Sequence, residues 1–314
     1  MMNNTRYLAG FTLIELLVVL MILTVLSTIA VQSLDHVQDQ SHYDATKRAM
    51  VELEHAIVGQ ADARDSSGAA IVTGFIADLG RLPKAVDHDL DAATPLQPAE
   101  LWQNPFATGF AIRPADATNL PAADSALADA EVKVPCGWRG PYLRMPFGES
   151  VLNDGWGKPF DLRKANRTDP CLANDLIEIF RSLGSDNTLT TSATNDYRED
   201  LYLNLKTDAV ATYPSVSQSN RVQNTFTITV HKTTLGNAPT GSVELRMFGP
   251  NPDTGLVKAV SFTQAASGAP LVFTVTSTIG PRMFRAYEGT SKSAPRQVTV
   301  TNFEPGNVDL VLKP

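Results

Sequence analysis

The longest apolar stretch of the chain lies near its start. From Phe11 to Val31 there are 21 residues, and Glu15 is the only charged residue among them. This length matches the roughly 20 apolar residues with which a helix crosses a bilayer core. An ordinary secretory signal peptide is the alternative, but its apolar region normally covers only about 7 to 15 residues. The pattern therefore predicts a membrane-spanning helix over residues 11–31.

A helical pattern continues beyond the apolar stretch. Apolar and small residues recur at three- and four-residue steps from Leu34 to Gln60, and charged residues occupy the other faces. No proline interrupts this segment, and the turn-forming residues 65–68 follow it. We expect one helix from Phe11 to about Arg64, with its first half in lipid and its second half packed on a globular head.

The rest of the chain favours β-structure. Seven prolines between Pro83 and Pro135 exclude a long helix or a central strand there, so this stretch is expected to be a surface insertion. Residues 177–182 are predicted to form a strand. After a linker at 207–220, short segments of mostly alternating polarity predict an all-β sandwich of about seven antiparallel strands over residues 221–314.

Charge and motifs narrow the range of functions. The net charge is −7 and the chain has no long run of Lys or Arg, which argues against nucleic acid as a partner. Arg6 precedes the apolar stretch, whereas Asp35 and Asp39 follow it, so the start is expected in the cytoplasm and the remainder outside it. The sequence lacks a nucleophile elbow, a P-loop, a dinucleotide fingerprint and a zinc motif. We therefore expect a protein that is not an enzyme.

Cys136 and Cys171 are the only cysteines. An even pair on the exported side of a membrane suggests a disulfide between them. Two buried thiols are the alternative.

Glu15 has two interpretations. Near the start of a helix the dipole favours an anion, so the acid can be a terminal charge without a special task. However, Gly10, Phe11 and the residues up to Glu15, followed by "LLVVLMIL", resemble the prepilin signature of type IV pilins and type II secretion pseudopilins. This resemblance implies cleavage after Gly10 by a prepilin peptidase and N-methylation of Phe11. It also implies pairing of Glu15 with the freed amine of a neighbouring subunit, which would offset the cost of burying the acid.

Residues 140–163 resemble a conserved region of major pseudopilins. Gly140 to Leu143 match, as do Asp154, Trp156, Gly157 and Pro159, whereas Gly155 replaces a proline of the family. We interpret these residues as determinants of the fold, with no chemistry of their own.

The segment after the predicted strand resembles the calcium-holding loop of major pseudopilins. The side chains of Asp186, Asp196 and Asp200, with the carbonyls near Leu183 and Ser185, are candidate oxygen ligands for calcium. A solvated polar loop without metal is the alternative interpretation.

The expected fold is α+β: a leader (1–10), a long helix (11–64), a small antiparallel pilin head (65–206), and a β-sandwich after the linker. The expected function is that of a structural subunit of a type IV pilin-like filament, most like a secretion pseudopilin that supports protein export. A minor pilin that presents its sandwich as an adhesin or substrate-binding module is the alternative, and a monomeric tethered protein is a third. The resemblance implies an inner-membrane anchor with a periplasmic head. The implied partners are other copies, related pilin-like subunits, the prepilin peptidase and an inner-membrane assembly platform.

Overall fold

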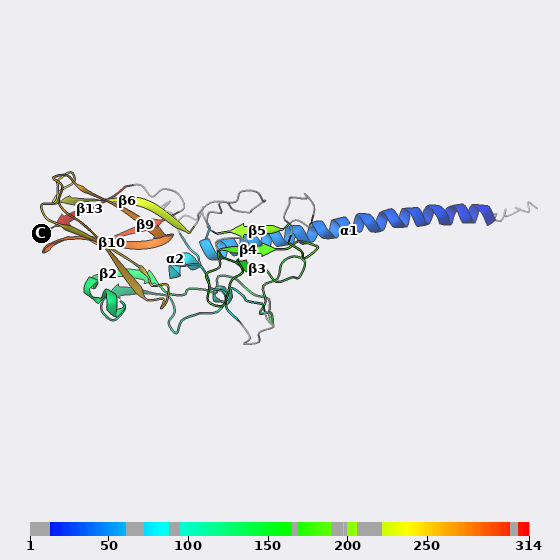
Figure 1. Cartoon of the computed structure of the whole chain (residues 1–314), viewed down its shortest axis with the longest axis horizontal. Coiled ribbons are helices and arrows are strands. Elements are labelled where there is room, and N and C mark those ends of the chain that lie inside the picture. Colours follow the sequence, from blue (N-terminus) through cyan, green and yellow to red (C-terminus); the bar gives the residue numbers. More distant parts are fainter. Residues whose placement is uncertain are drawn as a thin grey trace, which may run out of the picture.

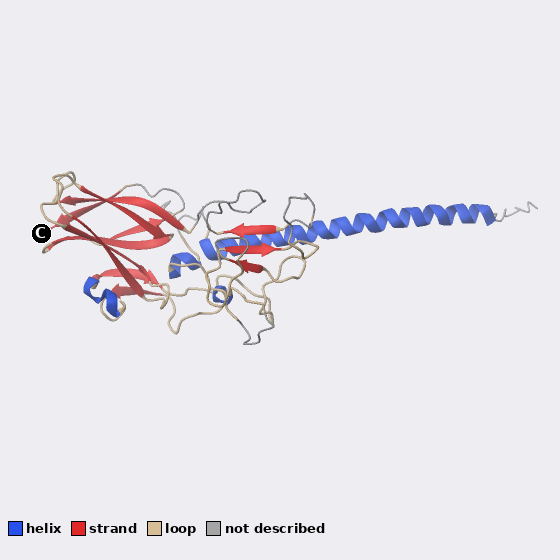
Figure 2. Cartoon of the chain, viewed as in Figure 1, coloured by secondary structure: helices blue, strands red, loops and turns tan. Residues whose placement is uncertain are grey.

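One long helix and a set of β-sheets make up the described part of the chain (Figure 2). The helix α1 runs from Leu13 to Val58, which is about 69 Å at 1.5 Å per residue. The computed structural model describes the following residues, with the backbone alone at 30–36: 13–60, 72–87, 95–164, 169–189, 197, 200–205, 222–301 and 307–313. Figure 1 shows the first half of α1 extending away from the rest of the chain.

The second half of α1 packs against the head. Met50, Leu53 and Ile57 are fully buried at the three- and four-residue spacing of one helical face. The helix ends at Val58, whereas the sequence pattern predicted an end near Arg64. Gly59 has φ +88°, and a Cβ at this position would lie 1.6 Å from the Thr73 carbonyl oxygen. The chain therefore leaves the helix where only glycine fits against the segment that leads into the head.

The head contains a short helix and a three-stranded sheet. Helix α2 (Phe75–Leu79) packs on α1, and β3 (Asp161–Arg163), β4 (Ile179–Ser182) and β5 (Leu201–Asn204) form the antiparallel order β3-β4-β5. The strand predicted at 177–182 is thus confirmed for its last four residues. The side chains of α1, α2, β4 and β5 enclose one hydrophobic core.

The proline-rich insertion contains a β-hairpin. After the short 3₁₀ turn η1 (Ala99–Leu101), β1 (Ala111–Ala115) and β2 (Asp129–Cys136) pair antiparallel, with the 3₁₀ turn η2 (Ala122–Leu127) between them. The apolar side chains of β2 share a core with Phe248, Val257 and Ala259 from the C-terminal sheet. The hairpin therefore packs on the C-terminal domain, although in sequence it belongs to the stretch expected to form the head.

Eight strands follow after residue 222 and form the C-terminal domain. The strands are β6 (Gln223–Lys232), β7 (Val243–Pro250), β8 (Val257–Gln264), β9 (Leu271–Thr278), β10 (Gly280–Glu288), β11 (Ser291–Ser293), β12 (Arg296–Val300) and β13 (Val308–Lys313). Their order is β8-β7-β10-β11-β13-β6-β9, and β12 pairs with β10. All neighbours are antiparallel except β6 and β13, which are parallel.

The sheet of the C-terminal domain is continuous and curls around its own core. Phe226 on β6 and Phe284 on β10 are not on neighbouring strands, yet their rings lie 5.7 Å apart edge to face inside one hydrophobic cluster. This differs from the predicted sandwich of about seven antiparallel strands. The described part of the C-terminal domain has eight strands and one parallel pair, and the short β11 joins β10 to β13 by hydrogen bonds. One long helix followed by mostly β-structure is consistent with the predicted α+β class.

Candidate assembly and binding surfaces

The stem, Leu13–Ile29, is an apolar helix without protein around it. Its described side chains are all exposed: Leu13 at one end is 83% exposed and Ile29 at the other end is 59% exposed. Glu15 lies in its first turn. The hydroxyl of Thr28 donates to the Thr24 carbonyl at 2.8 Å, and the hydroxyl of Thr24 donates to carbonyls of the preceding turn. Because these two threonine hydroxyls are satisfied within the helix, they can enter an apolar environment without losing their hydrogen bonds.

The predicted membrane span at 11–31 extends beyond the stem at both ends: residues 11 and 12 lie outside the described part, and residues 30 and 31 are described by their backbone alone. Within the described residues, no helix combines the length and the apolar character that crossing a membrane requires. Gly10 and Phe11, the predicted cleavage and methylation residues, also lie outside the described part of the chain.

The candidate calcium ligands are only partly described. Leu183, Ser185 and Asp186 follow β4, and Asp186 is exposed and accepts a hydrogen bond from the Thr188 amide at 3.0 Å. Asp200 is fully buried and accepts from the Tyr202 hydroxyl at 3.0 Å. Asp196 lies outside the described residues. No group of three His, Cys, Asp or Glu side chains suited to a metal ion occurs in the described part, and calcium stays a prediction.

The predicted disulfide is not formed. Both cysteines are free and buried, Cys136 in the core that β2 shares with the C-terminal domain and Cys171 in the core of the head. Burial raises the pKa of each thiol to about 11, which keeps both protonated and unreactive. The structure agrees with the alternative of two buried thiols, because Cys136 and Cys171 enter different hydrophobic cores.

The head and the C-terminal domain meet at a close joint between α2 and β10. Gly280 has φ +119°, and a Cβ there would lie 2.7 Å from the Cα of Ala77. Next to it, the guanidinium of Arg282 is only 2% exposed and donates to the carbonyls of Ala77, Ile279 and Pro281 at 3.4, 2.9 and 2.8 Å. Burial lowers the pKa of Arg282 to about 10, so it stays protonated at neutral pH. The joint thus holds a buried positive charge that binds backbone oxygens on both sides.

Asp78 on α2 is the acid of this joint. Its carboxylate is 2% exposed, lies 3.0 Å from Nη2 of Arg139, and accepts from the Tyr142 hydroxyl at 2.8 Å. Burial raises its pKa to about 6, and the charges of Arg139 and Arg282 and the Tyr142 hydrogen bond oppose this shift. The sequence analysis did not predict this buried carboxylate. The signal for it is an acid within the apolar run "FIADL".

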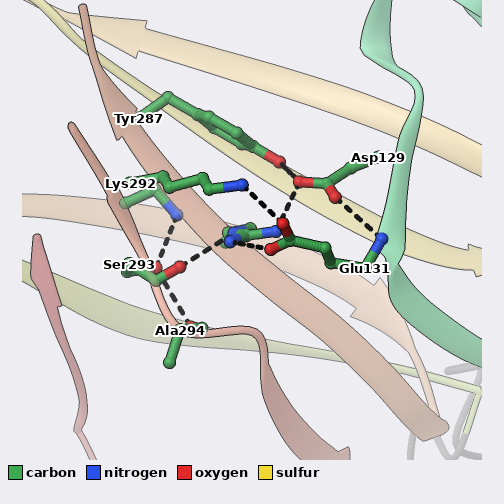
Figure 3. Close-up of polar contacts among 8 residues, drawn as sticks. Asp129, Glu131, Tyr287, Lys292, Ser293 and Ala294 are labelled. Atoms are coloured by element: carbon green, nitrogen blue, oxygen red, sulfur yellow. Dashed lines mark hydrogen bonds and ion pairs between the residues drawn. The ribbon is translucent and has the colours of Figure 1, made fainter. Parts of the chain in front are cut away.

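A second contact, the clasp, ties the hairpin to the C-terminal domain. Figure 3 shows Asp129 and Glu131 of β2 converging with Tyr287 and Lys292 of β10 and β11. Arg285, 4% exposed in its side chain, pairs with Asp129 at 2.7 Å and with Glu131 at 2.6 Å. The Tyr287 hydroxyl also donates to Asp129, and Lys292 pairs with Glu131 at 2.8 Å. Two acids from residues 129–131 therefore face a cationic patch more than 150 residues later in the chain.

The comparisons with known proteins concern the start of the chain. Residues 6–31 match the family model of the prokaryotic N-terminal methylation motif. No curated protein matches the chain. The matched segment includes Gly10, Phe11 and Glu15, and it supports a type IV pilin-like protein that a prepilin peptidase processes.

Proposed function

We propose that this protein is a subunit of a type IV pilin-like filament, most like a type II secretion pseudopilin, that serves protein export. The observation that carries the proposal is the methylation motif at 6–31 together with the exposed apolar stem that follows it. Exposed apolar side chains along four turns of a helix favour burial against lipid or against the stems of other copies. Before assembly the stem anchors the protein in the inner membrane, with the head in the periplasm.

In this proposal Glu15 sets the register between neighbouring subunits. An acid inside a bundle of apolar stems needs a cation, and the amine of Phe11, freed by cleavage after Gly10, supplies one on the next copy. The role is structural, and no reaction is assigned to the protein. Its partners are further copies, related pilin-like subunits, the prepilin peptidase and the inner-membrane assembly platform.

A second candidate is a minor pilin that presents the C-terminal domain as an adhesin or substrate-binding module. The arrangement in Figure 1 favours it, because the C-terminal domain lies at the end of the molecule opposite the stem. Antibody labelling of the C-terminal domain on isolated filaments separates the two. Label along the whole filament supports the structural subunit, and label only at the ends supports the minor pilin.

Processing and assembly are tested separately. Mass spectrometry of the mature chain should find a first residue Phe11 that carries one methyl group. Glu15→Ala should reduce incorporation into filaments at least tenfold, whereas Glu52→Ala, an exposed acid on the same helix, should assemble normally. A mature chain that begins at Met1, or equal assembly of Glu15→Ala and wild type, would overturn the proposal.

A further inference from the structure

A pocket of about 250 Å³ lies between the end of α1 and the loop that follows β2. His55 and Ala56 from the last turn of α1 form one side, and Arg139 to Tyr142 form the other. Asp78 also lines it. The stem and the clasp contribute nothing to this pocket, and the proposed filament role leaves it unused.

Arg139 is fixed at the wall of the pocket but keeps hydrogen-bonding capacity. Its Nη2 lies 3.0 Å from Asp78, and its guanidinium carbon lies 4.0 Å from the centroid of the Phe110 ring. The side chain nevertheless remains 45% exposed. A guanidinium carries five N–H donors in a planar fork, so holding it by one nitrogen and one face leaves donors for a ligand at little further entropic cost.

The charges around the pocket favour an anion. Asp78 is the acid that faces both Arg139 and the buried Arg282, so two guanidinium charges surround this one carboxylate. Both oxygens of Asp78 are engaged, by Arg139 and by the Tyr142 hydroxyl, and the carboxylate is almost inaccessible. A cationic ligand would therefore meet an exposed guanidinium and an acid that is already paired. The exposed ring of His55 adds a nitrogen at the opposite wall.

We infer that this pocket binds a carboxylate group, held bidentately by Arg139. A carboxylate carries a negative charge, and its two oxygens fit the planar fork of a guanidinium. Two sources supply this chemistry, a small free acid and the carboxyl terminus or acidic side chain of a polypeptide. The described lining does not distinguish them, so the probes must.

The test is an NMR titration of the full chain in detergent micelles, with ¹⁵N-labelled arginine. Propionate represents a free acid, N-acetyl-Ala-Ala represents a chain terminus, and N-acetyl-Ala-Ala amide is the uncharged control. We expect saturable shifts of the Arg139 Nε signal with at least one carboxylate and none with the amide. Tighter binding of the peptide acid than of propionate assigns the source to a polypeptide, and the reverse assigns it to a free acid.

Variants test the role of Arg139. Arg139→Gln should weaken binding about tenfold or more, because a charge-assisted pair of hydrogen bonds is lost. Arg144→Gln, an exposed arginine of the following loop, should bind as wild type. If Arg139→Gln does not fold, Arg139→Lys keeps the charge beside Asp78 but lacks the fork, and it should bind severalfold more weakly. Absence of saturable binding to wild type, an equal response to the amide, or unchanged affinity in the Arg139 variants would overturn the inference.

Discussion

Asp78 couples the folding of the head to pH. The folded state raises its pKa from 3.8 to about 6, chiefly because the carboxylate is buried. The folded state therefore binds this proton more tightly than the unfolded state does. The stability that protonation contributes is complete below about pH 4 and is lost as the pH rises through 6. At about 1.4 kcal/mol per pKa unit, the contribution is on the order of 3 kcal/mol.

Asp78→Asn should remove this part of the pH dependence. Denaturant unfolding measures the free energy of unfolding between pH 4 and 7. As the pH rises, this free energy should fall more steeply for wild type than for Asp78→Asn. Asp116→Asn is the control, because a hydrogen bond from Thr118 lowers the pKa of that acid and gives it the opposite dependence. Asp116→Asn should retain the Asp78-dependent fall. Parallel curves for wild type and Asp78→Asn would contradict the prediction.

At the scale of elements, the loop before β3 locks onto α1 at Gly155. The amide of Gly155 donates to the Thr46 hydroxyl at 2.9 Å, and Nδ1 of His42 donates to the Gly155 carbonyl at 2.5 Å. A Cβ on Gly155 would lie 2.0 Å from the His42 carbonyl oxygen, which belongs to the helix backbone. No side chain fits there, so this position requires glycine.

Gly155→Ala should push the loop away from α1 and lower the unfolding free energy by about 3 kcal/mol. This value is at the upper end of the usual cost of overpacking, because the new Cβ would collide with helix backbone, which cannot move aside as a side chain can. Gly109→Ala is the matched control: its Cβ would meet no atom closer than 3.9 Å. Urea unfolding of both variants measures the difference. Equal midpoints for the two would show that the contact between the loop and α1 is not tight.

The helix, the hairpin and the C-terminal strands differ in how well the sequence predicted them. The periodicity of α1 and the alternation in residues 221–314 predicted a long helix and a β-rich domain, because both patterns are local. The end of α1 was misplaced, since Gly59 stops the helix through a contact with Thr73 across a reversal of the chain. The hairpin was missed because Pro114 and Pro135 read as breakers, whereas a two-stranded pair tolerates them.

The site residues also divide into those marked by a local sequence pattern and those brought together only by the fold. Gly10, Phe11 and Glu15 lie within one short segment that matches the methylation motif, so a local pattern was enough to predict their roles, which stay a prediction. The pairing of Asp78 with Arg139, and of Asp129 with Arg285, joins residues about 60 and 156 positions apart. No local pattern marks such partners. The disulfide prediction failed for a related reason, because cysteine count and compartment carry no information on which core each cysteine enters.

On the scale of the whole molecule, several contacts among the described residues hold the C-terminal domain to the head. They include the joint of α2 with β10, the hydrogen bond from Arg81 to the Pro252 carbonyl at 2.6 Å, and the clasp between β2 and Arg285. Because the hairpin starts and ends in the head but packs on the C-terminal sheet, it acts as a further connection besides the chain itself. Separated contacts of this kind restrict rotation of the C-terminal domain against the head.

Arg285→Met should weaken this coupling. Removing the guanidinium leaves Asp129 buried with Tyr287 as its remaining clasp partner, and breaking a buried pair costs about 3 to 5 kcal/mol. Calorimetry should then resolve a transition for the C-terminal domain below that of the head, whereas wild type should melt in one step. Arg296→Met, an exposed arginine that donates to the Asp309 carbonyl within the same domain, should leave the single transition intact. A single, unshifted transition in Arg285→Met would mean that the clasp is not needed to couple the C-terminal domain to the head.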